Sequence, residues 1–153
     1  MKPVISLAPT EPLSTKHQSV PADVQMEAIF IPTTGSVEEL ALAAYLSCLA
    51  DPSPVGKLIA QLALCKAGHV QIPQDSKLVF SSQNNQVCGI NLHDHMIRKG
   101  SLNAIEEWVR NIGGYLHCRI RSVVSQILSK GGLAIVIANE TVDLGVVYLR
   151  YAK

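Results

Sequence analysis

Helix start and stop signals in this chain come in two adjacent pairs, and this grouping limits its fold more than any other feature. The first helix opens with the capping box of Ser36 and Glu39 and runs to a stop at Asp51-Pro52. A second helix follows at once, because Ser53-Pro54 supplies an N-cap with proline in the first turn and Gly68 marks the end. Two consecutive helices are therefore expected in the first half of the chain.

The second pair of helices is expected after Ser101, which is itself an N-cap. The apolar stripe that follows Ser101 stops at Gly113-Gly114, and the next stripe is followed by Lys130 and Gly131-Gly132. The residues expected to face the core are Leu102, Ile105, Trp108, Val109 and Ile112 in the third helix, and Ile120, Val123, Val124, Ile127 and Leu128 in the fourth.

Strands are expected before, between and after these helix pairs. Apolar residues that alternate or cluster, bounded by polar turns, predict the ranges Val24–Ile31, Lys77–Phe80, Gln86–Leu92, Met96–Lys99, Leu133–Ala138 and Leu144–Tyr151, with a hairpin turn at Asn139–Thr141. Strands and helices are grouped rather than strictly alternating. The predicted fold class is therefore α+β, with an antiparallel sheet of about six strands flanked by helices.

Length and composition fit a single folded domain. The chain has 153 residues, of which 48% are apolar and 16% charged, below the roughly 25% charged residues of average domains. The first residues are rich in proline and lack apolar periodicity. We expect residues 1–22 to form a flexible N-terminal tail and residues 23–153 to form one domain.

Charge and apolar patterning argue against several classes of function. A formal net charge of +1 gives no reason to expect a nucleic-acid partner, and the richest apolar stretch, Leu40–Ala50, is shorter than the roughly 20 residues of a membrane span. No signal peptide is visible, and the cysteines form no C-x-x-C pair, so neither a zinc site nor a disulfide framework is predicted. We expect a cytoplasmic protein in a reducing compartment, with no membrane insertion and no metal of its own.

Lys99-Gly100-Ser101 is the stretch most suited to a ligand on its residues alone. Lys99 offers a positive charge, Gly100 would let a ligand approach the backbone, and the N–H groups after Ser101 add positive potential. An anion or nucleotide pocket is one interpretation, but a capped helix after an exposed basic strand end is favoured on physical grounds. His93-Asp94-His95 offers two imidazoles without a third ligand nearby, which favours a solvated turn over a metal site.

A resemblance to a known family is carried by GINLHDHMIRKGSLNAIEEWV, which begins at Gly89. This string is similar to part of the nucleotide-binding (N) domain in the catalytic B subunit of Kdp-type potassium-transporting P-type ATPases. The resemblance extends to EAIFIPTTGSVEELALAAYLSCLADPSPVGKLIA, VRNIGGY, SKGG and LGVVYLR, and so covers roughly Val24 to Arg150. It implies a sheet with helices at its sides that holds ATP for a separate phosphorylation domain.

The resemblance also implies residues of an adenine pocket. Lys99 and Gly100 match the family's pocket lysine and glycine, and Gly56 matches the glycine of its second-helix motif. The expected nucleotide-binding residues are Lys99, Gly100, Gly56, Phe80, Cys88 and Gly89.

Five residues depart from the family's pattern. The aromatic residue that stacks on adenine falls at Ser81 here, with Phe80 one residue earlier, and a shift of one residue on a strand reverses the face. The acidic residue before the helix glycine is Val55, the pocket serine is Cys88, and a threonine-proline pair is Leu133-Ala134. Phe80 can stack on a base only if the strand contains a bulge or a local slip.

These features predict a stand-alone domain that binds ATP or ADP weakly, with a dissociation constant of about 1 mM or near −4 kcal/mol. Residues before Val24 lack the phosphorylation motif, which favours a stand-alone domain over an excised fragment. The chain is not expected to be an enzyme by itself, because D-K-T-G-T, T-G-D and G-D-G-x-N-D are absent and no hydrolytic constellation is evident. The alternative is a repurposed, non-catalytic protein-interaction module that kept the fold, lost the nucleotide and binds a protein partner.

Single residues outside the candidate pocket are expected to have structural roles. Trp108 lies at core spacing and is expected to be a buried anchor, while Cys48 and Cys65 should behave as small hydrophobic residues in their helices. The basic residues Arg98, Arg119, Arg121, Lys130 and Arg150 are expected on a solvated surface.

Overall fold

Three serine caps begin three of the helices, as the sequence predicts. The computed structural model describes residues 25–83 and 86–151. In the capping box, Ser36 Oγ accepts the N–H of Glu39 and Glu39 Oε1 accepts the N–H of Ser36. The helices are α2 (Val37–Cys48) after Ser36, α3 (Pro54–Ala67) after Ser53, α4 (Leu102–Asn111) after Ser101 and α5 (Cys118–Ser129) after His117.

The six strands form one antiparallel sheet in the order β1-β6-β5-β4-β3-β2. Their bounds are β1 (Met26–Pro32), β2 (Lys77–Val79), β3 (Cys88–Asn91), β4 (Met96–Gly100), β5 (Leu133–Asn139) and β6 (Val142–Tyr151). The predicted α+β class with an antiparallel sheet is confirmed. Three strands begin two residues away from the predicted start: β1 and β3 begin later, and β6 begins earlier. The ends of β1 to β5 each differ by one residue from the predicted ends.

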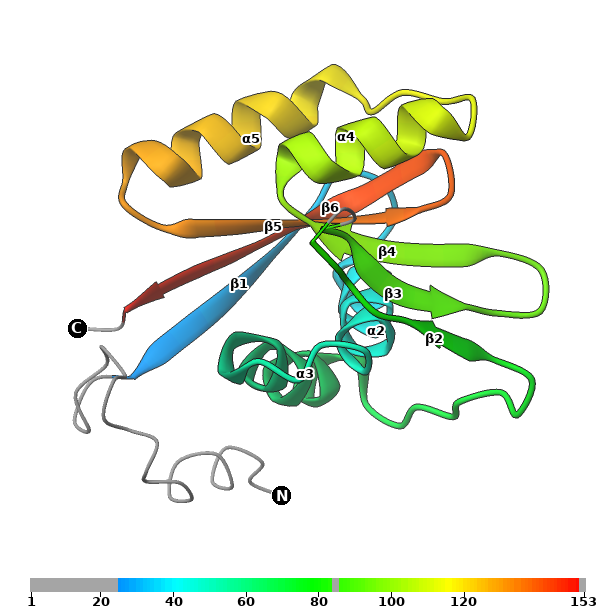
Figure 1. The fold of residues 1–153 in the computed structure, drawn as a ribbon. Helices are drawn as coiled ribbons and strands as arrows, with labels where there is room; N and C mark the ends of the chain where they lie inside the picture. Colours follow the sequence, from blue (N-terminus) through cyan, green and yellow to red (C-terminus); the bar gives the residue numbers. More distant parts are fainter. Residues whose placement is uncertain (1–24, 84–85, 152–153) are drawn as a thin grey trace.

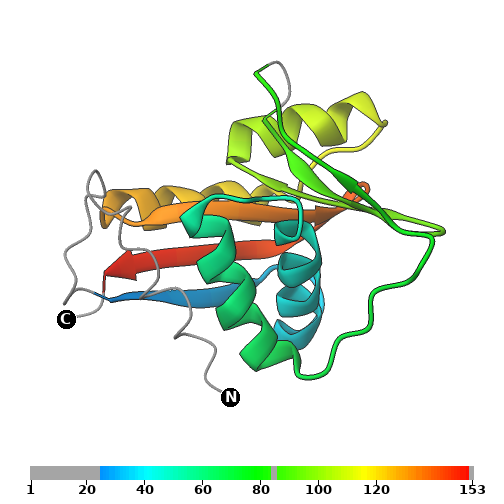
Figure 2. The same cartoon turned by 60° about the horizontal axis from the view of Figure 1, so that its bottom comes forward.

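Helices cover both faces of the sheet, so the domain has three layers (Figure 1). Helices α2 and α3 pack on one face and α4 and α5 on the other, and the rotated view in Figure 2 shows the same separation. The core under α2 and α3 includes Leu40, Ile59, Ile90, Ile97 and Val147. The core under α4 and α5 includes Ile105, Val109, Ile120, Val136 and Val146.

The expected tail, residues 1–22, lies outside the described residues. Within the part of the chain that the structure describes, no helix is both long and apolar enough to cross a membrane.

Several side chains differ from their expected exposure. Arg98 is buried at 6% exposure rather than solvated, because its guanidinium lies over the Trp108 ring and donates to Asn91 Oδ1. Trp108 is half-buried, and Cys65 is exposed instead of packed in the core. Ile112 and Leu128, expected to face inward, are 37% and 57% exposed because they lie at the ends of their helices.

Candidate nucleotide site

Strand β4 sends its two adjacent basic residues to opposite faces of the sheet. Successive side chains on a strand alternate between faces. Lys99 therefore faces the layer of α2 and α3, together with Ile97, while Arg98 faces α4 and Trp108. Both basic residues are 6% exposed, so neither forms the exposed basic strand end that the sequence alone favoured.

Lys99 forms an ion pair with Asp51, which lies in the connection between α2 and α3. The Nζ atom of Lys99 donates to Oδ2 of Asp51 at 2.6 Å, and the side chains are 7% and 17% exposed. Burial alone would lower the pKa of Lys99, but the neighbouring Cys48 and the hydrogen-bonded Asp51 carboxylate hold that pKa above its ordinary value. The lysine charge that the sequence assigned to a ligand is thus held by a carboxylate of the same chain.

Asp51 is fixed by the first turn of α3. Its Oδ1 atom accepts the backbone N–H of Ser53 at 2.9 Å, and Ser53 Oγ accepts the N–H of Gly56 at 3.1 Å. A Cβ atom at position 56 would lie 2.6 Å from Cβ and Oδ2 of Asp51. Gly56 therefore leaves the space in which the Asp51 side chain lies.

Two buried cysteines adjoin the ion pair. Cys88 is the cross-strand partner of Lys99, and its Sγ lies 4.0 Å from the carbonyl oxygen of Ser47 in α2. Burial raises the pKa of the Cys48 thiol to about 12 and also raises the pKa of Cys88, so both are neutral thiols at pH 7. Asp51 and Lys99 are therefore the charged groups of this cluster.

Phe80 follows the edge strand β2 and is 57% exposed. The register pairs Leu78 with Ile90 and Val79 with Gly89, and its extension by one pair would set Phe80 opposite Cys88. That parity corresponds to the face of Lys99. Since β2 ends at Val79, Phe80 lies beyond the regular strand, where its direction is not fixed by sheet pairing.

Gly89 and Gly100, the other glycines of the expected pocket, leave space for the backbone of neighbouring segments. A Cβ atom at Gly89 would clash with the carbonyl oxygen of Ile97 on the neighbouring strand. At Gly100 it would lie 3.2 Å from the carbonyl oxygen of Gln86 and from Val87. Both glycines therefore permit the chain to pack closely beside Lys99.

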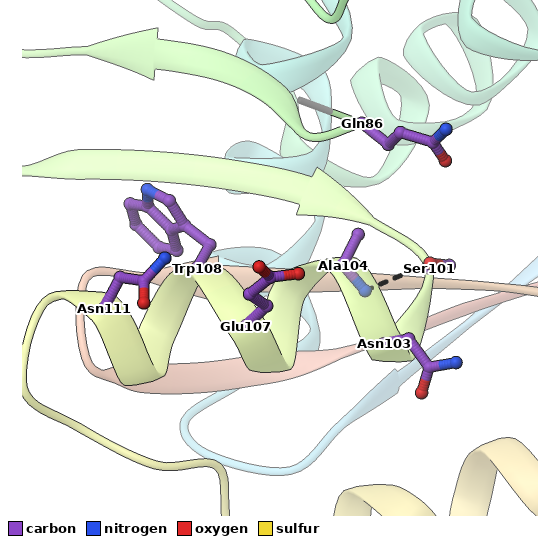
Figure 3. A pocket seen from close by; sticks show the side chains of 7 residues that line it. All are labelled: Gln86, Ser101, Asn103, Ala104, Glu107, Trp108 and Asn111. Atoms are coloured by element: carbon purple, nitrogen blue, oxygen red, sulfur yellow. Dashed lines mark hydrogen bonds between the residues drawn. The ribbon is translucent and has the colours of Figure 1, made fainter. Parts of the chain in front are cut away.

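An open hollow of about 560 Å³ lies on the opposite face of the sheet, along α4 (Figure 3). It is lined by Gln86, Ser101, Asn103, Glu107, Trp108 and Asn111, mostly polar residues. Of the expected site residues, none lines it. The sequence-predicted site and this hollow are thus separate places.

The two histidines in the turn between β3 and β4 each lie within hydrogen-bond distance of a carboxylate. His93 Nδ1 lies 3.2 Å from Asp75 Oδ2, and His95 Nδ1 lies 2.7 Å from Asp94 Oδ1. Among residues 25–83 and 86–151, no three His, Cys, Asp or Glu side chains are grouped so that they could hold a metal ion.

Sequence comparison relates the chain to subunits of potassium pumps. It is 37% identical over 125 residues to the potassium-transporting ATPase ATP-binding subunit of Clostridium botulinum, and 35% identical over 127 residues to that of Tolumonas auensis. These alignments cover 79% and 80% of this chain and 18% of each relative. No protein-family model matches the chain.

Solved structures of other P-type ATPases share the fold. The N-domain of HMA6, a copper-transporting P-type ATPase, superposes with a TM-score of 0.52 at 19% identity, covering 83% of this chain and 96% of that one. A zinc-transporting PIB-type ATPase in its E2.Pi state gives a TM-score of 0.62 at 11% identity, covering 86% of this chain and 19% of that one. The chain is an N-domain homologue of P-type ATPases.

This N-domain homologue spans about a fifth of the length of the potassium-pump subunits it matches. The remaining four fifths of those subunits have no counterpart in the alignment. The homology therefore concerns one domain, and the activity of a whole ATPase does not follow from it.

Sequence reasoning missed Asp51 as the partner of Lys99. In the sequence, Asp51-Pro52 was identified only as a helix stop, and Lys99 lies 48 residues further along. No local pattern connects positions so far apart. The one available signal was that a buried basic residue on a central strand requires a carboxylate partner.

Proposed function

We propose that the N-domain homologue binds adenine nucleotides, ATP or ADP, on the α2 and α3 face of its sheet. One observation carries this proposal: Gly56 and Lys99, which match the family, and Cys88, at the position of the family's pocket serine, come from three separate elements and lie around Asp51. The relatives named as ATP-binding subunits match this chain over the same region. Phe80, exposed directly after the edge strand β2, is the ring on which we expect a base to stack.

We expect weak binding and no hydrolysis by this chain alone. One stacking ring and a lysine that is already ion-paired support a dissociation constant of about 1 mM, near −4 kcal/mol. The phosphorylation motif D-K-T-G-T does not occur in the sequence. A reducing, cytoplasmic compartment remains the expectation from the sequence, whose cysteines form no C-x-x-C pair.

Phe80→Ala tests the proposed function without disturbing the core. We expect saturable backbone amide shifts near Cys88 and Lys99 when ATP is titrated into the wild-type protein, and a loss of affinity of at least fivefold in Phe80→Ala. Tyr115→Ala is the matched control, because Tyr115 is an exposed aromatic residue in the α4–α5 connection. A flat titration of the wild-type protein would disprove nucleotide binding.

The second candidate function is a protein-interaction module that kept this fold and lost the nucleotide. The observation that favours it is the ion pair itself, because Lys99 is 7% exposed and already neutralised by Asp51. A flat nucleotide titration together with saturable binding to a protein partner would establish this second candidate.

A further inference from the structure

The two edge strands of the sheet differ in how well they resist pairing with a further strand. Strand β2 has three residues, with Lys77 and Leu78 exposed, and short edges that carry lysine resist further pairing. Strand β1, at the other edge, has seven residues and no lysine (Figure 2). Within residues 25–83 and 86–151, no strand pairs with its outer side. Strand β1 is therefore the edge that is suited to pairing.

Two contacts fix which backbone groups of β1 point away from β6. The N–H of Thr33, directly after the strand, donates to the carbonyl oxygen of Leu144. A Cβ atom built on Gly145 would meet the carbonyl oxygen of Ile31, so that carbonyl also points toward β6. The direction alternates along a strand of an antiparallel pair. The residues of β1 whose N–H groups point outward are therefore Met26, Ala28 and Phe30.

The face of β1 on the side of α4 and α5 is partly open. Helix α5 packs on β5 and β6. Ile29 and Ile31 contact the core beneath α4 and α5, but both are only half-buried. Glu27, the charged residue of the strand, lies on the same face and is paired with Arg150 at 3.1 Å. A strand beside β1 would thus cover apolar side chains without meeting an unpaired charge.

Strand β1 can pair with an antiparallel copy of itself over its whole length. Its central residue is Ile29, so full overlap places the two-fold axis there. Ala28 of one copy then lies opposite Phe30 of the other, and Met26 lies opposite Pro32. Every outward N–H meets an outward carbonyl oxygen, and Pro32, which has no N–H, has only to accept. The two Ile29 side chains lie directly opposite each other, where cross-strand contacts are closest.

We propose that β1 is a self-association edge, through which two copies of this chain pair in antiparallel orientation about an axis at Ile29. The two sheets then become one. This interface lies at the edge opposite to β2 and Phe80, so it does not depend on the proposed nucleotide site. One pair of strands gives a small interface, and small interfaces are weak and reversible. We expect a dissociation constant on the order of 100 µM.

Sedimentation equilibrium of the full chain measures this association. We expect the average mass to rise from 16.5 kDa toward twice that value as the concentration approaches about 1 mM. Ile29→Lys sets two like charges opposite each other at the axis and should weaken the dimer by at least about tenfold. Ile31→Lys is the matched control, because this half-buried isoleucine on the same face would lie opposite Glu27 of the second copy. It should change the affinity by less than about threefold.

Hydrogen exchange of the wild-type protein locates the interface. The amides of Met26, Ala28 and Phe30 should exchange about threefold more slowly at about 1 mM than at about 10 µM, because the second copy accepts from them. The amides of Ile29 and Ile31 point toward β6 and should be protected at both concentrations. The alternation along the strand is specific to pairing at this edge.

The outcomes decide between a second copy and other occupants of the edge. A chain that stays monomeric at about 1 mM overturns the proposal. If its outward amides are nevertheless slow at every concentration, a segment of the same chain covers β1. A rise in mass without slower exchange at these amides also overturns it, because the copies then meet elsewhere. Equal weakening by Ile29→Lys and Ile31→Lys overturns the axis at Ile29. If a lysine variant does not fold, the exchange pattern of the wild-type protein still decides whether β1 is the interface.

Discussion

At the scale of single residues, Gly56 and Asp51 constrain each other. Alanine is usually favoured over glycine in a helix by about 1 kcal/mol. Here the added Cβ would lie 2.6 Å from Cβ and Oδ2 of Asp51, in the first turn of α3. We therefore expect Gly56→Ala to reduce the free energy of unfolding by about 1–3 kcal/mol, measured by urea denaturation.

A double-mutant cycle shows whether the contact with Asp51 is the cause. In an Asp51→Gly background both the carboxylate and its Cβ are gone, so adding Gly56→Ala should be neutral or slightly stabilising. Asp51→Gly itself leaves the buried Lys99 without its partner and should be strongly destabilising. An equal cost of Gly56→Ala in both backgrounds would mean that Asp51 is not what the new methyl group meets.

The candidate site was only partly predictable at this scale. Lys99 and Gly56 were identified by resemblance, but the sequence could not show that the lysine is ion-paired, because Asp51 is 48 residues away. Arg98 was expected on the surface from its charge alone. It is buried because Asn91, two backbone carbonyl oxygens and the Trp108 ring satisfy its guanidinium.

At the scale of elements, the Asp143 side chain on β6 binds two segments: the one that precedes α2 and the one that precedes α5. Its Oδ2 atom accepts the hydroxyl of Thr33, before α2, at 2.6 Å, and Oδ1 accepts the N–H of His117, before α5, at 2.9 Å. Asp143 is 3% exposed. We expect Asp143→Ala to cost about 2–3 kcal/mol of unfolding free energy and to accelerate hydrogen exchange of the His117 amide.

Ser101→Ala provides the comparison for this prediction. It removes the N-cap of α4, whose hydroxyl accepts the N–H of Ala104, and should cost about 1 kcal/mol. Exchange should then increase at Ala104 while the His117 amide stays protected. If Asp143→Ala left the His117 amide protected, Asp143 would not be the group that fixes the start of α5.

Elements with local signals were predicted, and those that depend on distant pairing were not. The caps at Ser36, Ser53 and Ser101 lie within three residues of the N–H groups they accept. The cap of α5 was missed, because a His117 ring nitrogen accepting from Arg119 is not a common N-cap. Local patterns carried no information on sheet order, in which β1 pairs with β6 near the other end of the chain.

At the scale of the whole molecule, one sheet separates two apolar cores. Each core contains side chains whose exposure to solvent can be measured separately. The single tryptophan, Trp108, packs against the α4 and α5 core. Cys48 and Cys88 are buried beneath α2 and α3, and burial raises the pKa of both thiols. Cys65 and Cys118 are exposed and serve as internal standards. The two layers can therefore be followed independently during unfolding.

We expect both layers to unfold in one transition, because each strand of the shared sheet contributes side chains to its faces and neither layer can bury its apolar surface without it. In urea, the exposed thiols of Cys65 and Cys118 should react with a thiol reagent at once. The two buried thiols should become reactive only at the midpoint reported by Trp108 fluorescence. Ile90→Ala removes a fully buried side chain of the α2 and α3 core and should cost about 2–5 kcal/mol. It should shift both midpoints equally, whereas thiol reactivity that appears well before the fluorescence change would show that the α2 and α3 layer opens separately.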